Sequence, residues 1–553
     1  MRYQYDETIR AFGTSKNSDI QRASRYAIIA AATCFTLAWL WPFHTAPWAT
    51  FEQESLCFIA LIILIPAILT TKTLKAEPAV FGLLALSATP ALQLQLGILR
   101  FTGDAWLATS YLVAFCAAVF SGYNIAQAPR ARDILTTCLA SAFTIAAIAS
   151  TWIALRQWFG LADSIYEINL SGSRPFGNLA QPNNLATLLC LALASILYFF
   201  ERRMLSTFSA GLLTLFLIAG VTITQSRTPW LVCGVFLVFW AYKEKTRKPR
   251  LTLTALTCWT LLYALCVILL PITAKALMLH SVDLVGRATS LQRLELWDHF
   301  ITAILSSPAL GYGWNQISSA QLANTSTIPA GMMATYSHNL ILDILLWTGP
   351  FAGIIIIGSL GAWLIRLNYC ANDIHKIYSL LAAGIILTHS MVEFPHSYAY
   401  FLIPLGLFLG IASTATARFS LPIKPYVVTA AGAAGLLLLV QIAVEYKTLQ
   451  RDQFAYQISS AKVKGFPAEN LRNIHLLTHL RALQNLRRTT PIRMTQDEIE
   501  NLEHITERFP YLANLYKIKL ISKLSDTPKK ESDYLELIRK LHGEAAYEQA
   551  KQN

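Results

Sequence analysis

A series of apolar runs of membrane length, separated by short polar segments, constrains the fold of this chain more than any other feature. The chain has 553 residues, of which 54% are hydrophobic and only 14% are charged, and its mean hydropathy is +0.43. This composition excludes an ordinary soluble protein. Because a membrane leaves backbone groups no water to bond, the runs are predicted to be helices of an all-α polytopic membrane protein. Thirteen runs lie at about 26–42, 55–70, 78–97, 105–125, 134–156, 184–200, 206–224, 229–242, 251–273, 339–365, 377–394, 397–414 and 425–444.

The basic residues alternate between the two sides of the membrane in a regular way. If the N-terminus is cytoplasmic, the short inner loops hold fifteen Lys and Arg residues, and the short outer loops hold only Arg100, Arg174 and Arg227. Cytoplasmic loops of membrane proteins carry such an excess. The net charge of +13 therefore reflects topology and does not indicate nucleic-acid binding. The alternation predicts a multi-pass protein of a bacterial inner membrane.

The same topology divides the chain into three parts. Residues 1–25 are predicted to be a cytoplasmic segment, residues 26–444 a transmembrane domain and residues 445–553 a periplasmic domain. Two longer loops of the transmembrane domain, about 157–184 and 274–338, fall on the periplasmic side. The last part is charged, with helical patterns, and recognition of an acceptor is one role for it.

The nine cysteines give no sign of a disulfide or a metal centre. All lie in predicted spans or, for Cys370, in an inner loop, and none has the Cys/His spacing of a zinc site. We expect neither a metal nor another cofactor.

The first periplasmic loop groups a cation with several amides at the membrane surface. Its sequence SGSRPFGNLAQPNNLA contains Arg174, Asn178, Gln181 and Asn183. Its Pro and Gly residues exclude a long helix, and Asn183 or Asn184 is placed to cap the next span. A substrate-binding loop and a simple helix cap both fit this pattern.

Arg227 lies in a short turn between two spans, in the segment TITQSRTPW. A guanidinium at the bilayer edge costs free energy unless it reaches lipid headgroups or meets an anion. Both interpretations remain open from position alone.

The second periplasmic loop carries the largest collection of polar candidates. Its segment SLQRLELWDHFITAIL is predicted to be an amphipathic helix, on which Arg293 and Trp297 are four residues apart, so that the indole can stack on the guanidinium. Arg287 lies just before that helix. The loop ends at Tyr336, His338 and Asn339, where the chain re-enters the bilayer, and a Gly349–Pro350 break follows within the next span.

Three further polar residues, His389, Glu393 and His396, lie near the same outer surface. We interpret them as ordinary interfacial groups rather than as catalytic ones. Since most polar groups within or beside the spans lie toward their outer ends, the site is predicted to be one-sided. A transporter would place such groups near the bilayer midplane.

Several arginines and a histidine on one membrane face are suited to a phosphorylated lipid substrate. Arginine binds phosphate oxygens through two hydrogen bonds and stays charged. Histidine can accept a proton from an attacking hydroxyl near neutral pH.

The segments SRPFGNLAQPNNLA, SRTPW, RLELW with PALGYGW, and YSHNLILDILLWTGPFAG resemble those of the PglL-type O-oligosaccharyltransferases in the O-antigen ligase and polymerase superfamily. The resemblance covers roughly residues 166–413. It implies a helical glycosyltransferase of the C type that moves a preassembled glycan from undecaprenyl pyrophosphate onto an acceptor hydroxyl in the periplasm, without metal. It also implies that His338 is essential and that Arg227 and Arg293 bind the pyrophosphate.

The acceptor remains open at this point. The loop 174–184 resembles the protein-glycosylating branch, which favours Ser or Thr of a pilin or another periplasmic protein. Lipid A core, a growing glycan in a polymerase reaction, and a lipid-linked glycan transporter are the alternatives, in that order.

Overall fold

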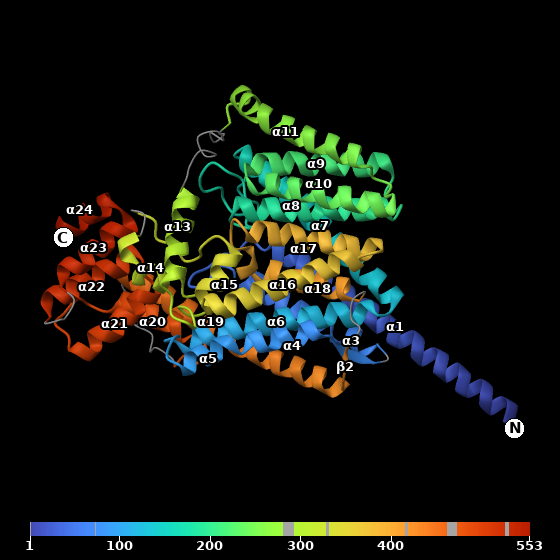
Figure 1. The fold of residues 1–553 in the computed structure, drawn as a ribbon, viewed down its shortest axis with the longest axis horizontal. Helices are drawn as coiled ribbons and strands as arrows, with labels where there is room; N and C mark the ends of the chain where they lie inside the picture. Colours follow the sequence, from blue (N-terminus) through green and yellow to red (C-terminus); the bar gives the residue numbers. More distant parts are fainter. Residues whose placement is uncertain are drawn as a thin grey trace.

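The computed structural model describes residues 2–71, 73–279, 292–327, 331–414, 419–461, 473–525 and 530–552, with side chains from residue 21 onward. It is an assembly of helices packed side by side, with a smaller group of helices at one end (Figure 1). The first half comprises α1 (Arg2–Leu40), α2 (Phe51–Ile63), α3 (Ile65–Leu69), β1 (Leu74–Ala76), α4 (Pro78–Ser87), α5 (Thr89–Gln95), α6 (Thr102–Ala126), α7 (Pro129–Trp158), α8 (Pro182–Glu201), α9 (Thr207–Thr224), α10 (Thr228–Arg247) and α11 (Leu253–Ala276).

The second half begins in the second long loop, which is predicted to be periplasmic, and ends in the terminal helices. Its elements are α13 (Gln292–Leu305), α14 (Ile317–Ala323), η1 (Thr325–Thr327), α15 (Leu340–Thr348), α16 (Pro350–Cys370), α17 (Ile374–Ser390), η2 (Pro395–Ser397), α18 (Ala399–Ser413), β2 (Leu421–Ile423), α19 (Pro425–Ser460), α20 (Thr478–Arg488), α21 (Gln496–Arg508), α22 (Leu512–Leu524), α23 (Glu531–His542) and α24 (Glu544–Gln552).

Each of the thirteen apolar runs forms a helix or a pair of helices, so the prediction of an all-α polytopic membrane protein is confirmed. Within the described ranges, nine helical segments are long and apolar enough to cross a membrane. The other four runs give helices that are shorter, interrupted or more charged. They are the α4–α5 pair, α10 with its charged end, and α17 and α18.

The predicted break at Gly349–Pro350 separates α15 from α16 and receives a turn of the periplasmic loop. Gly349 has a φ of +82°, and a Cβ atom there would lie 2.2 Å from the carbonyl oxygen of Ala309. The amide of Tyr312 donates to the carbonyl of Leu346 at 2.8 Å. The loop therefore docks directly on the interrupted helix, which fixes the residues that precede α15.

The loops predicted on the cytoplasmic side do meet at one face. β1 and β2 pair antiparallel, with Leu74 opposite Ile423, although more than 340 residues separate them in the sequence. On the same side, Arg132 pairs with Asp373 at 3.4 Å. This pairing agrees with the predicted alternation of sides.

The terminal helices α20–α24 form a group at the end of the bundle that also holds α13, α14 and α15 (Figure 1). Arg508 of α21 makes two hydrogen bonds to the carboxylate of Asp104 in α6, at 3.0 and 2.9 Å. The amide of Gly331 donates to the carbonyl of Lys540 at 2.9 Å. These contacts join the terminal helices to both the bundle and the periplasmic loop. The predicted domain boundary at residue 445 falls inside α19.

A close helix crossing in the bundle, between α6 and α18, depends on glycine. A Cβ atom at Gly410 would lie 2.1 Å from the carbonyl oxygen of Val119, so the two backbones leave no room for a side chain. We expect Gly410→Leu to lower the midpoint of thermal unfolding, because overpacking of this kind costs about 1–3 kcal/mol or more. Fluorescence-monitored unfolding of the detergent-purified protein measures the change.

Gly358→Leu is the matched control, since no atom lies within 4 Å of a Cβ built at that glycine on α16. An equal loss of stability in both variants would contradict the account of the crossing.

Candidate active site

His338 lies in a short turn whose backbone is fixed on both sides. Its φ is +60°, in the left-handed region that few non-glycine residues adopt. Before it, the amide of Ser337 donates to the buried carboxylate of Asp343 at 2.9 Å. After it, the Asn339 side chain caps α15 by accepting from the amides of Ile341 and Leu342. These bonds hold the imidazole in one place at the start of α15.

A single buried carboxylate, that of Glu393, joins three of the polar side chains on this face. Glu393 follows α17 and is 5% exposed. One of its oxygens lies 2.8 Å from Nδ1 of His338. The other accepts from the Arg293 guanidinium and from the Asn183 amide, the latter at 2.8 Å. The turn that carries His338, helix α13 and helix α8 thus converge on one acidic group.

Asn183 extends this network toward the other two arginines. Its side-chain oxygen accepts from Arg174 at 3.1 Å and from the hydroxyl of Ser226 at 2.8 Å. Arg174 also donates to the carbonyl of Thr224 at 2.9 Å. Arg227 is the next residue after Ser226, at the start of α10. The structure therefore brings Arg174, Asn183, Arg293 and His338 together and places the backbone of Arg227 beside them.

The electrostatic surroundings keep Glu393 ionised. Burial raises the pKa of its carboxyl group, but the hydrogen bond from His338 and the positive charge of Arg293 outweigh burial and leave the pKa below the ordinary value. Glu393 is therefore an anion at neutral pH. An anion hydrogen-bonded at Nδ1 favours the imidazole tautomer that carries its proton there, which leaves Nε2 with a lone pair.

Two further predicted residues support the turn. Trp297 of α13 donates its indole N–H to the carbonyl of Ser337 at 3.0 Å, and Tyr336 stacks on Phe394 with ring centroids 4.4 Å apart. Phe394 in turn meets the edge of the His338 ring. Trp297 and Tyr336 therefore hold the turn that carries His338.

The predicted stacking of Trp297 on Arg293 is wrong. Among the described residues, no cation–ring contact involves Arg293, because its guanidinium is paired with Glu393 and the indole points its N–H to Ser337. The prediction that Asn183 or Asn184 caps α8 is also wrong. That helix begins at Pro182 with Gln181 as its N-cap, and the Asn183 side chain is used by Glu393, Arg174 and Ser226.

Asn178 does not join the cluster. It is 1% exposed, and its amide nitrogen donates to the carbonyls of Leu40 and Tyr166, so it fastens the first periplasmic loop to α1. Gln181 is half-buried at the start of α8, and its side chain makes no hydrogen bond within the described part of the chain. Arg287 lies outside the described residues.

Glu393 was predicted to be an ordinary interfacial group, whereas the structure places it at the centre of the cluster. One signal in the sequence favoured it: three arginines and a histidine on one membrane face require an anion nearby. Spacing could not choose Glu393 because it lies 55 residues from His338 and 100 from Arg293.

Within the described ranges, no group of three His, Cys, Asp or Glu side chains is arranged to hold a metal ion. The cluster itself consists of guanidinium, imidazole, amide and carboxylate groups.

Two models of protein families match parts of the chain that contain residues of the cluster. A family model described as "O-Antigen ligase" matches residues 212–357, which include Arg227, Arg293 and His338. A second model, described as "Virulence factor membrane-bound polymerase, C-terminal", matches residues 377–553, which include Glu393. Over 540 residues, the chain is 28% identical to a general O-oligosaccharyltransferase of Acinetobacter baylyi, a match that covers 93% of this chain and 92% of the relative.

The chain is therefore similar to the O-antigen ligases over residues 212–357 and to a named O-oligosaccharyltransferase over nearly its whole length. A second relative, the ComP-specific O-oligosaccharyltransferase of the same organism, is 27% identical over 416 residues, which covers 73% of this chain and 74% of the relative. No solved structure matches the chain. Similarity to these relatives confirms the predicted type of enzyme, a membrane-bound glycosyltransferase of the O-oligosaccharyltransferase kind.

The ionisation of Glu393 makes a prediction about stability and pH. Its lowered pKa means that its contribution to stability is complete above the ordinary value of 4.5 and is lost as the pH falls through the lowered value. We expect Glu393→Gln to reduce the free energy of unfolding of this oligosaccharyltransferase by about 1–3 kcal/mol at neutral pH. The difference in free energy of unfolding between Glu393→Gln and wild type becomes smaller below about pH 4.5, where the wild-type carboxyl group begins to be protonated. Thermal unfolding of both proteins across a pH series measures it.

Glu500→Gln on α21 is the control, because the Glu500 side chain is 61% exposed. A Glu393→Gln difference that grows as the pH falls would show that the carboxyl group is not held as an anion.

Proposed function

We propose that this oligosaccharyltransferase moves a preassembled glycan from undecaprenyl pyrophosphate to Ser or Thr of a periplasmic protein. The enzyme acts from a bacterial inner membrane, with the His338 face toward the periplasm. The observation that carries the proposal is the contact of one buried carboxylate, Glu393, with both His338 and Arg293. The opposite face holds the cation-rich loops, which supports this orientation.

His338 prepares the acceptor hydroxyl. The imidazole carries its proton on Nδ1 and donates it in a hydrogen bond to the Glu393 carboxylate. It therefore presents the lone pair of Nε2 to the incoming hydroxyl. When Nε2 takes the hydroxyl proton, the ring becomes a cation, and the adjacent carboxylate stabilises that charge. The left-handed turn at His338 fixes where the proton is received.

The arginines bind the departing group. Arg174 and Arg293 bring guanidinium groups to the site, Arg227 is proposed as a third, and these groups pair with the oxygens of the pyrophosphate. Arg293 donates to Glu393 through Nη2, and the guanidinium group has five N–H donors in all. Arg293 can therefore bridge Glu393 and the leaving group.

The reaction is a single displacement at the anomeric carbon. The acceptor oxygen forms the new glycosidic bond as its proton passes to His338, and the bond from the anomeric carbon to the phosphate oxygen breaks. The electron pair leaves with undecaprenyl pyrophosphate, whose negative charge the arginines stabilise. Attack opposite the leaving group inverts the anomeric configuration.

An apolar cavity beside the turn of His338 fits the lipid part of the donor. It has a volume of about 540 Å³ and is lined near the site by Tyr336, His396 and Tyr398. From there it follows α18 inward from Leu402 to Leu409, a rise of about 10 Å. An isoprenoid chain placed there keeps its pyrophosphate at the level of the arginines.

A protein acceptor is favoured by the relatives, since both are called O-oligosaccharyltransferases and the longer match is to one called general. Pilin-like proteins are our first choice of acceptor. Lipid A core and a growing glycan are the competing acceptors, and glycan transport without transfer is the non-enzymatic alternative.

Replacing the proposed base separates these alternatives. In cells that make a lipid-linked glycan and a pilin-like acceptor, we expect His338→Ala to abolish the glycan mass on the acceptor and to leave the donor accumulated on the periplasmic side. The physical reason is that the hydroxyl then lacks a proton acceptor, a loss of about 10²–10⁴-fold. Intact-mass spectrometry of the acceptor gives the result.

His504→Ala on α21 is the matched control and is expected to retain transfer. A His338→Ala protein that folds and still modifies the acceptor would refute the proposed base. Transfer to lipid A core, with the protein acceptor unmodified, would show that the enzyme is an O-antigen ligase that acts on lipid A core.

The guanidinium geometry of Arg293 gives another expected outcome. Arg293→Lys keeps the positive charge but loses the planar fork that bridges Glu393 and the pyrophosphate, so transfer is expected to fall at least tenfold. Arg539→Lys, on the surface of α23, should transfer at the wild-type rate. Initial rates with purified enzyme and lipid-linked glycan measure both, and wild-type turnover by Arg293→Lys would contradict the role.

A further inference from the structure

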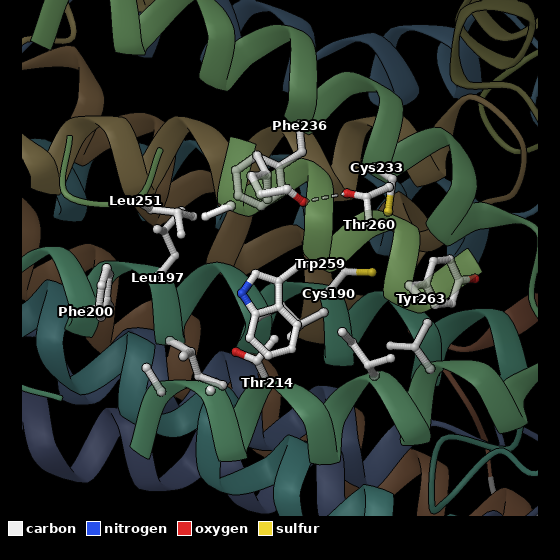
Figure 2. A pocket seen from close by; sticks show the side chains of 18 of the residues that line it. Cys190, Leu197, Phe200, Thr214, Cys233, Phe236, Leu251, Trp259, Thr260 and Tyr263 are labelled. Atoms are coloured by element: carbon white, nitrogen blue, oxygen red, sulfur yellow. Dashed lines mark hydrogen bonds between the residues drawn. The ribbon is translucent and has the colours of Figure 1, made fainter. Parts of the chain in front are cut away.

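A second apolar cavity lies away from the site, among helices α8, α9, α10 and α11 (Figure 2). Its volume is about 300 Å³. Figure 2 shows Trp259 and Tyr263 of α11 facing it together with Phe236 of α10 and Thr214 of α9. The cavity exists because α11 packs only loosely against its neighbours. Of the residues of α11, only Leu256, Tyr263, Leu270 and Ala274 are buried.

Water does not suit this cavity. Ordered water in a protein interior needs two to four polar partners, and a cavity lined by apolar side chains offers few. The hydroxyl of Thr260, which lines it, already donates to the carbonyl of Leu256 at 3.0 Å. If the space stayed empty, its lining would lose dispersion contacts over a large area. An apolar chain from the surrounding bilayer is the occupant that this lining favours.

The length of the cavity fits one acyl chain. Along α9 it extends from Thr207 to Val221, which at 1.5 Å per residue is about 21 Å. The hydrocarbon core of a bilayer is about 30 Å thick. The occupant therefore enters from one membrane surface and stops before the other.

The two ends of the cavity differ in charge, which identifies the surface from which the occupant enters. Arg250 lines the end opposite the His338 site, together with Thr207 and Thr252. Its guanidinium lies 3.9 Å from the ring centroid of Phe200 and donates to the carbonyl of Phe200 at 3.0 Å. At the other end the lining residues are apolar or aromatic, such as Val221, Pro229 and Tyr263. An anionic headgroup is therefore recognised at the Arg250 end.

Neighbouring charges strengthen that end. Lys245, Arg247 and Lys248 precede Arg250 in the same connection. Basic residues at a membrane surface attract anionic lipids electrostatically. Two carboxylates at this end are already bonded to backbone amides: Glu201 to those of Arg250 and Leu251, and Glu244 to that of Leu253.

We propose that this cavity binds an anionic glycerophospholipid. The lipid comes from the membrane leaflet on the Arg250 side, opposite the side of His338. Its phosphate pairs with Arg250, and one acyl chain fills the space between α11 and the helices α8, α9 and α10. The lipid fastens α11, and α11 leads into the second periplasmic loop. The polyprenyl donor is not the occupant, since the lining cation lies at the end away from the pyrophosphate-binding arginines.

The test compares two leucine substitutions. Gly211 lines the cavity, and the nearest atom to a Cβ built there is in Trp259 at 3.9 Å, so Gly211→Leu fills the space without a backbone clash. Gly234 on α10 has no atom within 4 Å of such a Cβ and does not line the cavity, so Gly234→Leu is the matched control. Each purified protein is incubated with phosphatidylglycerol carrying a photoreactive acyl chain, and crosslinked peptides are mapped by mass spectrometry.

Wild type and Gly234→Leu are expected to crosslink on α9 and α11, and Gly211→Leu to lose at least nine-tenths of that crosslinking while keeping its unfolding midpoint. Arg250→Gln should reduce it severalfold, and unlabelled phosphatidylglycerol should compete better than phosphatidylcholine. Equal competition by phosphatidylcholine, or crosslinking unaffected by Gly211→Leu, would overturn the proposal. Displacement by undecaprenyl phosphate with no effect of Arg250→Gln would also overturn it and assign the cavity to the donor.

Discussion

The site depends on one carboxylate held at the edge of the bundle. Glu393 is nearly excluded from solvent, and burial by itself would favour its neutral form. His338 and Arg293 reverse this tendency, and the resulting anion fixes both of them. Because an unpaired buried charge is costly, the three groups are stable only together.

The rest of the fold serves to bring these connections together. The break at Gly349 lets the periplasmic loop dock on α15, and the cap by Asn339 and the bond from Ser337 to Asp343 fix the turn between them. Asn183, at the start of α8, adds the first periplasmic loop through Arg174. The terminal helices contact the same loop through Gly331 and reach α6 through Arg508. The helical bundle thus positions a site that combines connections between helices with side chains from the starts of α8 and α13.

Much of the fold followed from the sequence because membrane helices are specified locally. A bilayer requires each span to satisfy its own backbone, so apolar length and the alternation of Lys and Arg were enough to find the helices and their sides. His338, Arg293 and Arg174 were found because polar groups at a membrane edge are rare. The partners of these residues were not found. The role of Glu393, the use of Trp297 to hold Ser337 and the inward placement of Asn178 depend on contacts between distant segments, and neither spacing nor composition specifies those contacts.

We infer that the His338 imidazole carries its proton on Nδ1, where it donates to Glu393, and that Nε2 is left open to the acceptor. Nitrogen-15 chemical shifts of labelled histidine measure this directly at about pH 8, where an imidazole is ordinarily neutral, with the His338 signals identified by their absence in His338→Ala. The account predicts a protonated Nδ1 and an unprotonated Nε2, with this preference lost in Glu393→Gln. A His338 ring that carries its proton on Nε2 in the wild-type protein would contradict it.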